Sequence, residues 1–233
     1  MLIPIRDENP RLRFPLVTLL LVVVNAIVFL LGRLLGPEQQ QQLIATGGAI
    51  PYEIVNHVDL APTNLLPWPG SILTSMFLHG GWLHLIGNMW FLWLFGDNVE
   101  ETLGRVRFLL FYLLAGTIGA LAQSFSLPLS TAPMIGASGA VAGVLGGYVI
   151  LYPRARVLTF ALIPFLWNFW HLPAWLFLGL WFLGQFFIGA GSGVAWMAHV
   201  GGFLAGLGVV RLLAPPVRAQ PVAVEYLPPG GPQ

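Results

Sequence analysis

The stretch MIGASGAVAGVLGGYVIL, residues 134–151, decides how this chain is to be interpreted, because it opens like a turn and continues as an apolar segment. Its one aliphatic hydroxyl belongs to Ser138, which has Gly136 two residues before it and Gly139 directly after it. No charged residue interrupts the segment, which is typical of a helix inside a membrane. The reason for a lone serine at the start of such a helix is therefore the first functional question.

The whole chain has the composition of a polytopic membrane protein. Of its 233 residues, 57% are hydrophobic and 8% are charged, whereas soluble domains carry roughly 25% charged residues. The formal net charge of +1 argues against nucleic acid as a partner, and the absence of cysteine excludes disulfides, thiol nucleophiles and cysteine-ligated metals. His57, His79 and His171 do not form a metal-spaced set, so we expect neither a metal nor a cofactor.

Apolar segments divide the chain into six candidate membrane helices. The first has a basic start like a signal peptide, but it is long and no small-residue cleavage site follows, so we interpret it as a retained span. The prediction is an all-α fold, a six-helix membrane domain over residues 14–213, with an N-terminal cytoplasmic segment at 1–13 and a disordered Pro/Gly-rich cytoplasmic tail at 214–233. The six segments are 14–32, 82–99, 106–125, 138–152, 172–188 and 193–213.

The arginines predict the orientation of these helices. With six crossings and both ends inside, every basic residue except Arg33 lies on the cytoplasmic side, as the positive-inside rule requires. The apolar run at 157–190 is long enough for two spans, but two crossings there would place Arg211 and Arg218 outside. We therefore interpret 157–170 as an interfacial approach segment.

Two connections have an expected structure. The outer loop at 33–81 is too long to be structureless in a compact domain, so we expect it to pack on the helices or to be partly embedded. A helix over 138–152 is about 22 Å long, which is less than the hydrocarbon thickness of about 30 Å. Residues 127–136 should then enter the membrane as non-helical backbone beside a protein-lined cavity that holds water.

Four polar side chains are predicted to share one depth near the outer ends of three helices that run in the same direction: His84, Asn88, Ser138 and His199. Placing such side chains inside a membrane span costs free energy, so these residues are candidates for a functional role. A serine and a histidine at one depth can act as nucleophile and general base, while His84 and Asn88, four residues apart on one helix face, can donate to an oxyanion. Each residue also has a purely structural alternative. Ser138 could hydrogen-bond to a carbonyl of its own helix, and His199 could be a buried histidine whose hydrogen bonds are satisfied. His84 and Asn88 could form polar contacts between helices.

Small residues provide a way to bring two of these helices together. They repeat at four-residue spacing on both helices, in stripes that begin one residue from Ser138 and from His199. Such stripes allow helix backbones to approach closely in membranes. Their members are Gly139, Gly143 and Gly147 on one helix, and Ala198, Gly202 and Gly206 on the other.

Three separated blocks resemble the signature of the rhomboid intramembrane serine proteases: LHGGWLHLIGNMWFLWLFGDNVEETLG, GASGAVAGVLGGY and AHVGGFLAG. The resemblance implies that Ser138 is the nucleophile and His199 the base of a dyad. It also implies that His84 and Asn88, with the Ser138 backbone N–H, form the oxyanion hole, and that Glu100 is a structural carboxylate. One departure is Ala142, because some members carry at this position a tyrosine that stacks on the base.

The resemblance implies an endopeptidase that cuts transmembrane protein substrates near the outer membrane surface, in contact with membrane lipids. We expect an integral protein of a prokaryotic inner or plasma membrane whose active site opens to the extracytoplasmic side, and nothing in the sequence specifies an oligomeric state. The alternative is a non-catalytic rhomboid-like protein that binds transmembrane clients; a channel or transporter is a more distant one. We expect His79 to be structural, and Asp97 and Glu101 to be solvated or paired with Arg105 or Arg107.

Overall fold

The structure is a computed structural model of the chain, and it describes residues 2–60, 66–163, 166–188 and 193–215. The predicted tail at 214–233 therefore lies almost entirely outside the described residues.

All six predicted membrane segments contain a helix. Among the described residues, three of these helices (α1, α6 and α9) are long and apolar enough to cross a membrane, so the chain is an integral membrane protein and six crossings stay a prediction. α7 and α8 have 14 and 12 residues, and α5 carries three carboxylates near its C-terminus. The bounds are α1 (Leu16–Leu34), α5 (Trp82–Leu103), α6 (Arg105–Ser126), α7 (Ser138–Leu151), α8 (Ala174–Gln185) and α9 (Trp196–Leu213).

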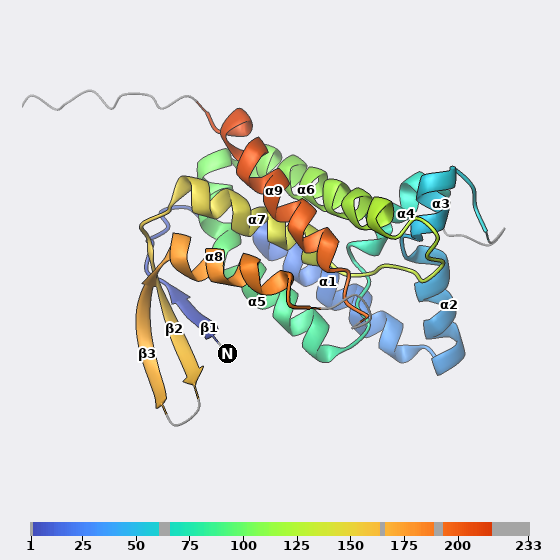
Figure 1. Cartoon of the computed structure of the whole chain (residues 1–233), viewed down its shortest axis with the longest axis horizontal. Helices are drawn as coiled ribbons and strands as arrows, with labels where there is room; N and C mark the ends of the chain where they lie inside the picture. The colour runs from blue at the N-terminus through green and yellow to red at the C-terminus, as the bar shows by residue number, and fades with distance from the viewer. Residues whose placement is uncertain (1, 61–65, 164–165, 189–192, 216–233) are drawn as a thin grey trace, which may run out of the picture.

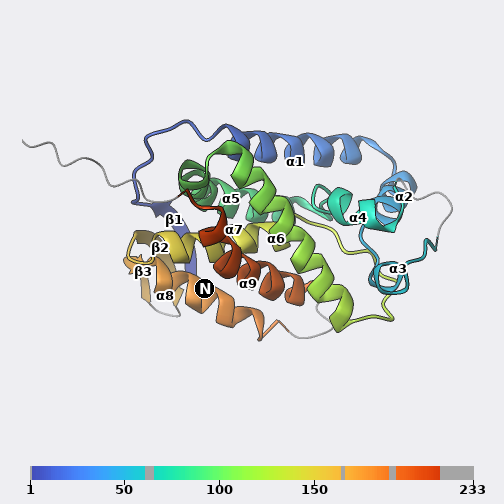
Figure 2. The same cartoon turned by 90° about the horizontal axis from the view of Figure 1, so that it is seen from above.

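α7 is the central helix of the bundle. Every residue from Gly139 to Tyr148 is buried, and the helix packs against α5, α6, α8 and α9 (Figures 1 and 2). A helix that is apolar on all sides is expected at such a position. α1, by contrast, leaves Leu20, Leu30 and Leu31 exposed, which suits a helix that faces lipid.

The predicted outer loop is largely helical. It contains α2 (Pro37–Gly47), α3 (Pro51–Asn56) and α4 (Trp68–Ser75), and the last two pack on α6. A small apolar cluster formed by Ala49, Ile54, Ile72 and Met76 joins these elements to the bundle. The expectation that this loop packs on the helices is confirmed.

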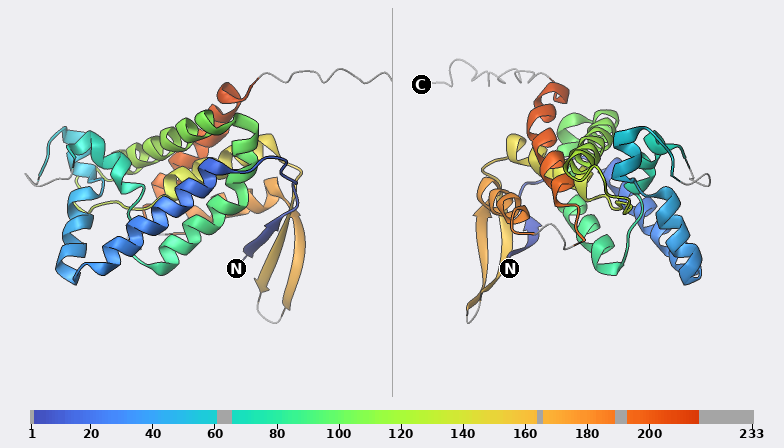
Figure 3. Two further views of the ribbon diagram at one scale, coloured as in Figure 1. Left: turned by 180° about the vertical axis from the view of Figure 1, so that it is seen from behind. Right: turned by 45° about the vertical axis from the view of Figure 1, so that its right-hand side comes forward.

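The prediction of an all-α fold is wrong in one respect, because the chain also forms a three-stranded antiparallel sheet. Its order is β1 (Leu2–Asp7), β2 (Arg156–Ile163) and β3 (Leu166–Pro173), and it lies at the end of the bundle opposite α2–α4 (Figure 3). The interpretation of 157–170 as an interfacial approach segment did not anticipate strands, whereas residues 157–163 and 166–170 belong to the paired strands β2 and β3. The reason is a period of two: Val157, Thr159 and Ala161 are fully buried on one face.

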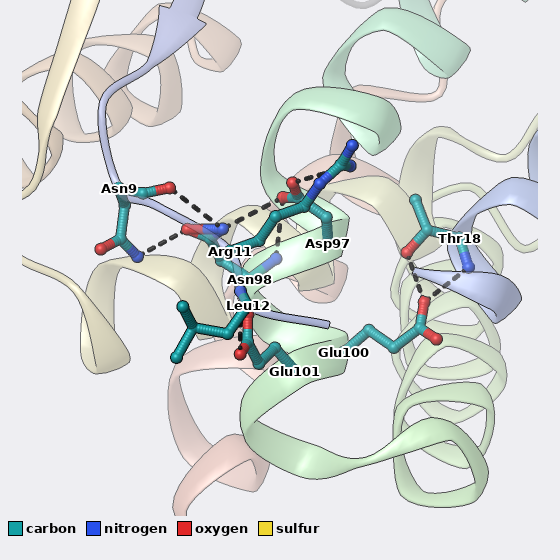
Figure 4. Close-up of polar contacts among 8 residues, drawn as sticks. All are labelled: Asn9, Arg11, Leu12, Thr18, Asp97, Asn98, Glu100 and Glu101. Atoms are coloured by element: carbon teal, nitrogen blue, oxygen red, sulfur yellow. Dashed lines mark hydrogen bonds and ion pairs between the residues drawn. The ribbon is translucent and has the colours of Figure 1, made fainter. Parts of the chain in front are cut away.

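Carboxylates near the C-terminus of α5 hold the segment that leads into α1 (Figure 4). Glu100 accepts hydrogen bonds from the backbone N–H groups of Val17 at 3.0 Å and Thr18 at 2.7 Å, and from Thr18 Oγ1 at 2.8 Å. It thereby satisfies first-turn N–H groups of α1 that have no partner within the helix. This is a structural role, as the resemblance implies.

The other two carboxylates have partners other than Arg105 or Arg107, although pairing with these arginines was one of the two arrangements expected for them. Asp97 pairs with Arg11, with 3.5 Å between Oδ2 and Nη1. Glu101 accepts the N–H of Leu12 at 3.0 and 3.2 Å (Figure 4). Both contacts reach back more than 80 residues along the chain, so their partners could not be read from neighbouring charges.

Candidate active site

Ser138 is the first residue of α7, and the connection that leads to it from α6 is non-helical from residue 127 to residue 137. Ala49 and Met134 exchange two backbone hydrogen bonds, of 3.0 and 2.8 Å, and the Gly136 N–H donates to the carbonyl of Ser75 at 2.8 Å. The elements of the 33–81 segment therefore hold the backbone that precedes Ser138.

Backbone donors that have no acceptor within their own helix and a small cavity lie at Ser138. Helical bonding in α7 begins with the Val141 N–H, which donates to the carbonyl of Ala137 at 2.9 Å. The N–H groups of Ser138 and the two residues after it consequently have no acceptor within the helix. The cavity beside them has a volume of about 30 Å³, which is sufficient for one water molecule. Its lining includes Ser138, Gly136, Gly139, Ser75, Met134 and Ala198.

His84 and Asn88 lie directly against the glycine that precedes Ser138 by two residues. Gly136 has a φ of +121°, and a Cβ atom there would lie 2.6 Å from His84 Nε2 and 3.8 Å from Asn88 Nδ2. A glycine is required, because any side chain would be strained and would displace the imidazole. Asn88 Nδ2 donates one hydrogen to the carbonyl of His84 at 3.0 Å, and its second N–H remains for another acceptor.

The two stripes of small residues face each other between α7 and α9. A Cβ atom on Gly139 would lie 3.4 Å from the carbonyl oxygen of Ala198. A Cβ atom on Gly202 would overlap the carbonyl oxygen of Gly139, and one on Gly206 would overlap that of Gly143. The residues adjacent to Ser138 and His199 in sequence, Gly139 and Ala198, therefore lie close together across the two helices, with room between them for no more than a Cβ atom.

Gly143 has an additional neighbour. A Cβ atom there would overlap the Cβ atom of Ala115 on α6 and would lie 3.2 Å from the carbonyl oxygen of Gly202. The backbones of α6, α7 and α9 therefore approach one another closely at this point.

His199 lies in the first turn of α9, where two buried glutamines contact this helix. Its Nδ1 is 2.7 Å from Gln185 Oε1 on α8, and the ring of Trp181 lies 6.1 Å from its ring centroid. Gln123 of α6 accepts the N–H of Met197 at 2.9 Å and so caps the start of α9. The sequence analysis did not select either glutamine. An amide side chain within an otherwise apolar helix is the feature that could have indicated both.

The remaining histidines are separate from this cluster or at its edge. His79 is buried next to His84, with ring centroids 5.0 Å apart. Burial, with a smaller contribution from His84, lowers the pKa of His79 to about 4, so this ring is neutral at pH 7. His57 packs on Trp68, and His171 pairs with Glu8 at 3.0 Å in the sheet region.

Residues 68–216 match the family described as the Rhomboid domain. The match covers more than half of the 233 residues, and the chain therefore belongs to the rhomboid family.

Individual relatives agree with this assignment. The chain is 34% identical over 146 residues to rhomboid protease GluP of Bacillus subtilis (strain 168), which covers 62% of this chain and 26% of the relative. It is 32% identical over 168 residues to RHOMBOID-like protein 5 of Arabidopsis thaliana, which covers 68% of this chain and 48% of the relative. Rhomboid protein 1, mitochondrial, of Saccharomyces cerevisiae is 37% identical over 94 residues, or 39% of this chain and 27% of the relative. The chain thus spans less than half the length of each.

Proposed function

We propose that this protein is an intramembrane serine protease that hydrolyses peptide bonds in or near transmembrane segments of membrane-protein substrates, with Ser138 and His199 as a catalytic dyad. The observation that carries the proposal is the close approach of α7 and α9 at Gly139 and Ala198, which are the sequence neighbours of the two proposed catalytic residues. The similarity to GluP, a rhomboid protease, supports the same reaction class.

The proposed reaction uses the dyad twice. Ser138 Oγ attacks the scissile carbonyl carbon while His199 Nε2 takes the hydroxyl proton. The protonated imidazole then gives this proton to the leaving amine as the C–N bond breaks, which leaves an ester on Ser138. Water, activated by the same imidazole, hydrolyses this ester and restores the serine.

The oxyanion formed in each step would be stabilised by the groups gathered at the start of α7. The Ser138 N–H is one donor, the second N–H of Asn88 is another, and His84 supplies a ring N–H. Donors fixed in place in a site of low polarity are each worth several kcal/mol in acyl transfer. The proximity of Gly136 to His84 Nε2 and Asn88 Nδ2 supports this role.

We further propose six crossings within residues 14–213, cytoplasmic termini and an active site near the extracytoplasmic surface of a prokaryotic inner or plasma membrane. The arginine distribution supports this orientation, because it leaves Arg33 alone on the outer side. The substrates would be transmembrane proteins.

The test is cleavage of a transmembrane reporter by the full chain in proteoliposomes, with Ser138→Ala as the comparison. The wild type is expected to cleave and the variant to be inactive. Equal cleavage by both would refute the mechanism. Binding of the reporter without cleavage by either form would instead favour a rhomboid-like protein that binds transmembrane clients.

A further inference from the structure

The imidazole of His199 has a polar partner that the dyad alone does not explain. Gln185, the last residue of α8, places Oε1 2.7 Å from His199 Nδ1. The glutamine is 5% exposed, and its neighbours on the helix are apolar. Burying an amide at this position costs free energy unless its polar atoms form hydrogen bonds.

A second hydrogen bond determines which way the amide of Gln185 points. Its Nε2 donates to the carbonyl of Trp181, one turn earlier on α8, at 2.9 Å. If the amide were rotated by 180°, two oxygens would face each other at this distance. The atom directed at His199 is consequently the oxygen, which can accept a hydrogen bond and cannot donate one.

This orientation determines the protonation of the ring. Because Gln185 offers an acceptor, Nδ1 of His199 must carry the proton, and in the neutral imidazole Nε2 then carries the lone pair. A general base that takes a proton from a serine hydroxyl through Nε2 requires this tautomer. The arrangement corresponds to the orienting group that generally accompanies a nucleophile and its base.

Gln185 and Trp181 also bear on the position of Ala142, where some rhomboids carry a tyrosine that stacks on the base. The alanine has no ring to stack on the base, whereas Trp181 of α8 lies 6.1 Å from the His199 ring with an interplanar angle of 37°. Both groups that restrain the imidazole thus come from α8, one through a hydrogen bond and the other through ring contact.

We propose that Gln185 is a positioning residue that holds His199 in the Nδ1–H tautomer and so leaves Nε2 free to accept the proton of Ser138. The proposal rests on the proposed protease function for its kinetic consequence, but the tautomer itself is a property of the folded protein.

The tautomer is measured by ¹⁵N NMR on the full chain in detergent with labelled histidine. The chain has five histidines, and the signals absent from the His199→Asn spectrum identify His199. In the wild type, Nδ1 of His199 is expected to carry the proton. Gln185→Met should remove this preference, whereas Gln185→Glu, which keeps an oxygen acceptor, should retain it. A wild-type ring protonated at Nε2 would overturn the proposal.

The kinetic consequence is measured with the transmembrane reporter. Gln185→Met should lower kcat by about tenfold to a hundredfold with little change in KM, because orientation of the base is lost while substrate contacts remain. Gln185→Glu should recover most of the rate. The matched control is Leu183→Met on the same helix, which is 56% exposed and should cleave like the wild type.

Two safeguards separate the possible failures. If Gln185→Met does not fold, as judged by its thermal midpoint, Gln185→Asn replaces it, because the shorter amide cannot reach Nδ1 and the same loss of rate is expected. Wild-type kcat in folded Gln185→Met or Gln185→Asn would overturn the positioning role. If the wild type cleaves no reporter, the proposed function fails, while the NMR measurement still decides the tautomer.

Discussion

Substituting Gly202 by alanine tests whether the contact between α7 and α9 sets the proposed dyad geometry. A Cβ atom on Gly202 would lie 2.9 Å from the carbonyl carbon of Gly139 and still closer to its oxygen. Ordinary contact begins at about 3.4 Å, so the helices must separate by roughly 1 Å. Because Gly139 and Ala198 adjoin Ser138 and His199, this separation acts directly on the proposed reacting groups.

The expected loss follows from this displacement. A misplacement of about 1 Å costs on the order of a hundredfold in rate, or about 2.7 kcal/mol of activation free energy. Overpacking a tight contact also lowers the free energy of unfolding by about 1–3 kcal/mol. Reporter cleavage in proteoliposomes and thermal denaturation in detergent are therefore measured together.

Gly208 provides the matched control, because it lies on the same helix and a Cβ atom there would have no neighbour within 4 Å. Gly208→Ala should retain activity and gain some helix stability from the better propensity of alanine. If Gly202→Ala cleaves the reporter as fast as Gly208→Ala, backbone contact between α7 and α9 does not position the dyad. The link between Ser138 and His199 would then depend on family resemblance.

Four further substitutions test separate parts of the site and fold. Ser138→Ala and His199→Ala should each abolish cleavage, with thermal midpoints close to that of the wild type, because each removes one member of a unit; measurable turnover by the serine variant would exclude it as nucleophile. Asn88→Ala should lower kcat by about 10²- to 10³-fold, since one oxyanion donor is lost, and a change confined to KM would assign Asn88 to substrate binding instead. Glu100→Ala should destabilise the fold by about 1–3 kcal/mol in thermal or chemical denaturation, because it leaves donors of α1 unpaired, and Glu38→Ala on α2, whose carboxylate is exposed, should not.

The positions of the helices could be predicted from the sequence because they depend on local properties. Apolar runs of sufficient length define the six segments, and each of them contains a helix within a few residues of the predicted bounds. The glycine stripes likewise indicated which helix faces approach one another, since only small residues permit backbone contact. Ser138, His199, His84 and Asn88 were selected because polar groups in apolar helices are few.

The tertiary structure alone decided which distant groups meet. Gln185 contacts His199 from 14 residues away, Gln123 caps α9 from 74 residues away, and Arg11 reaches Asp97 across 86 residues. The sheet depends in the same way on strands from both parts of the chain, because β1 pairs with β2 more than 140 residues later. A hydrogen bond or strand pairing is specified by two partners at once, and their separation in space is set by the packing of the whole bundle rather than by either local sequence.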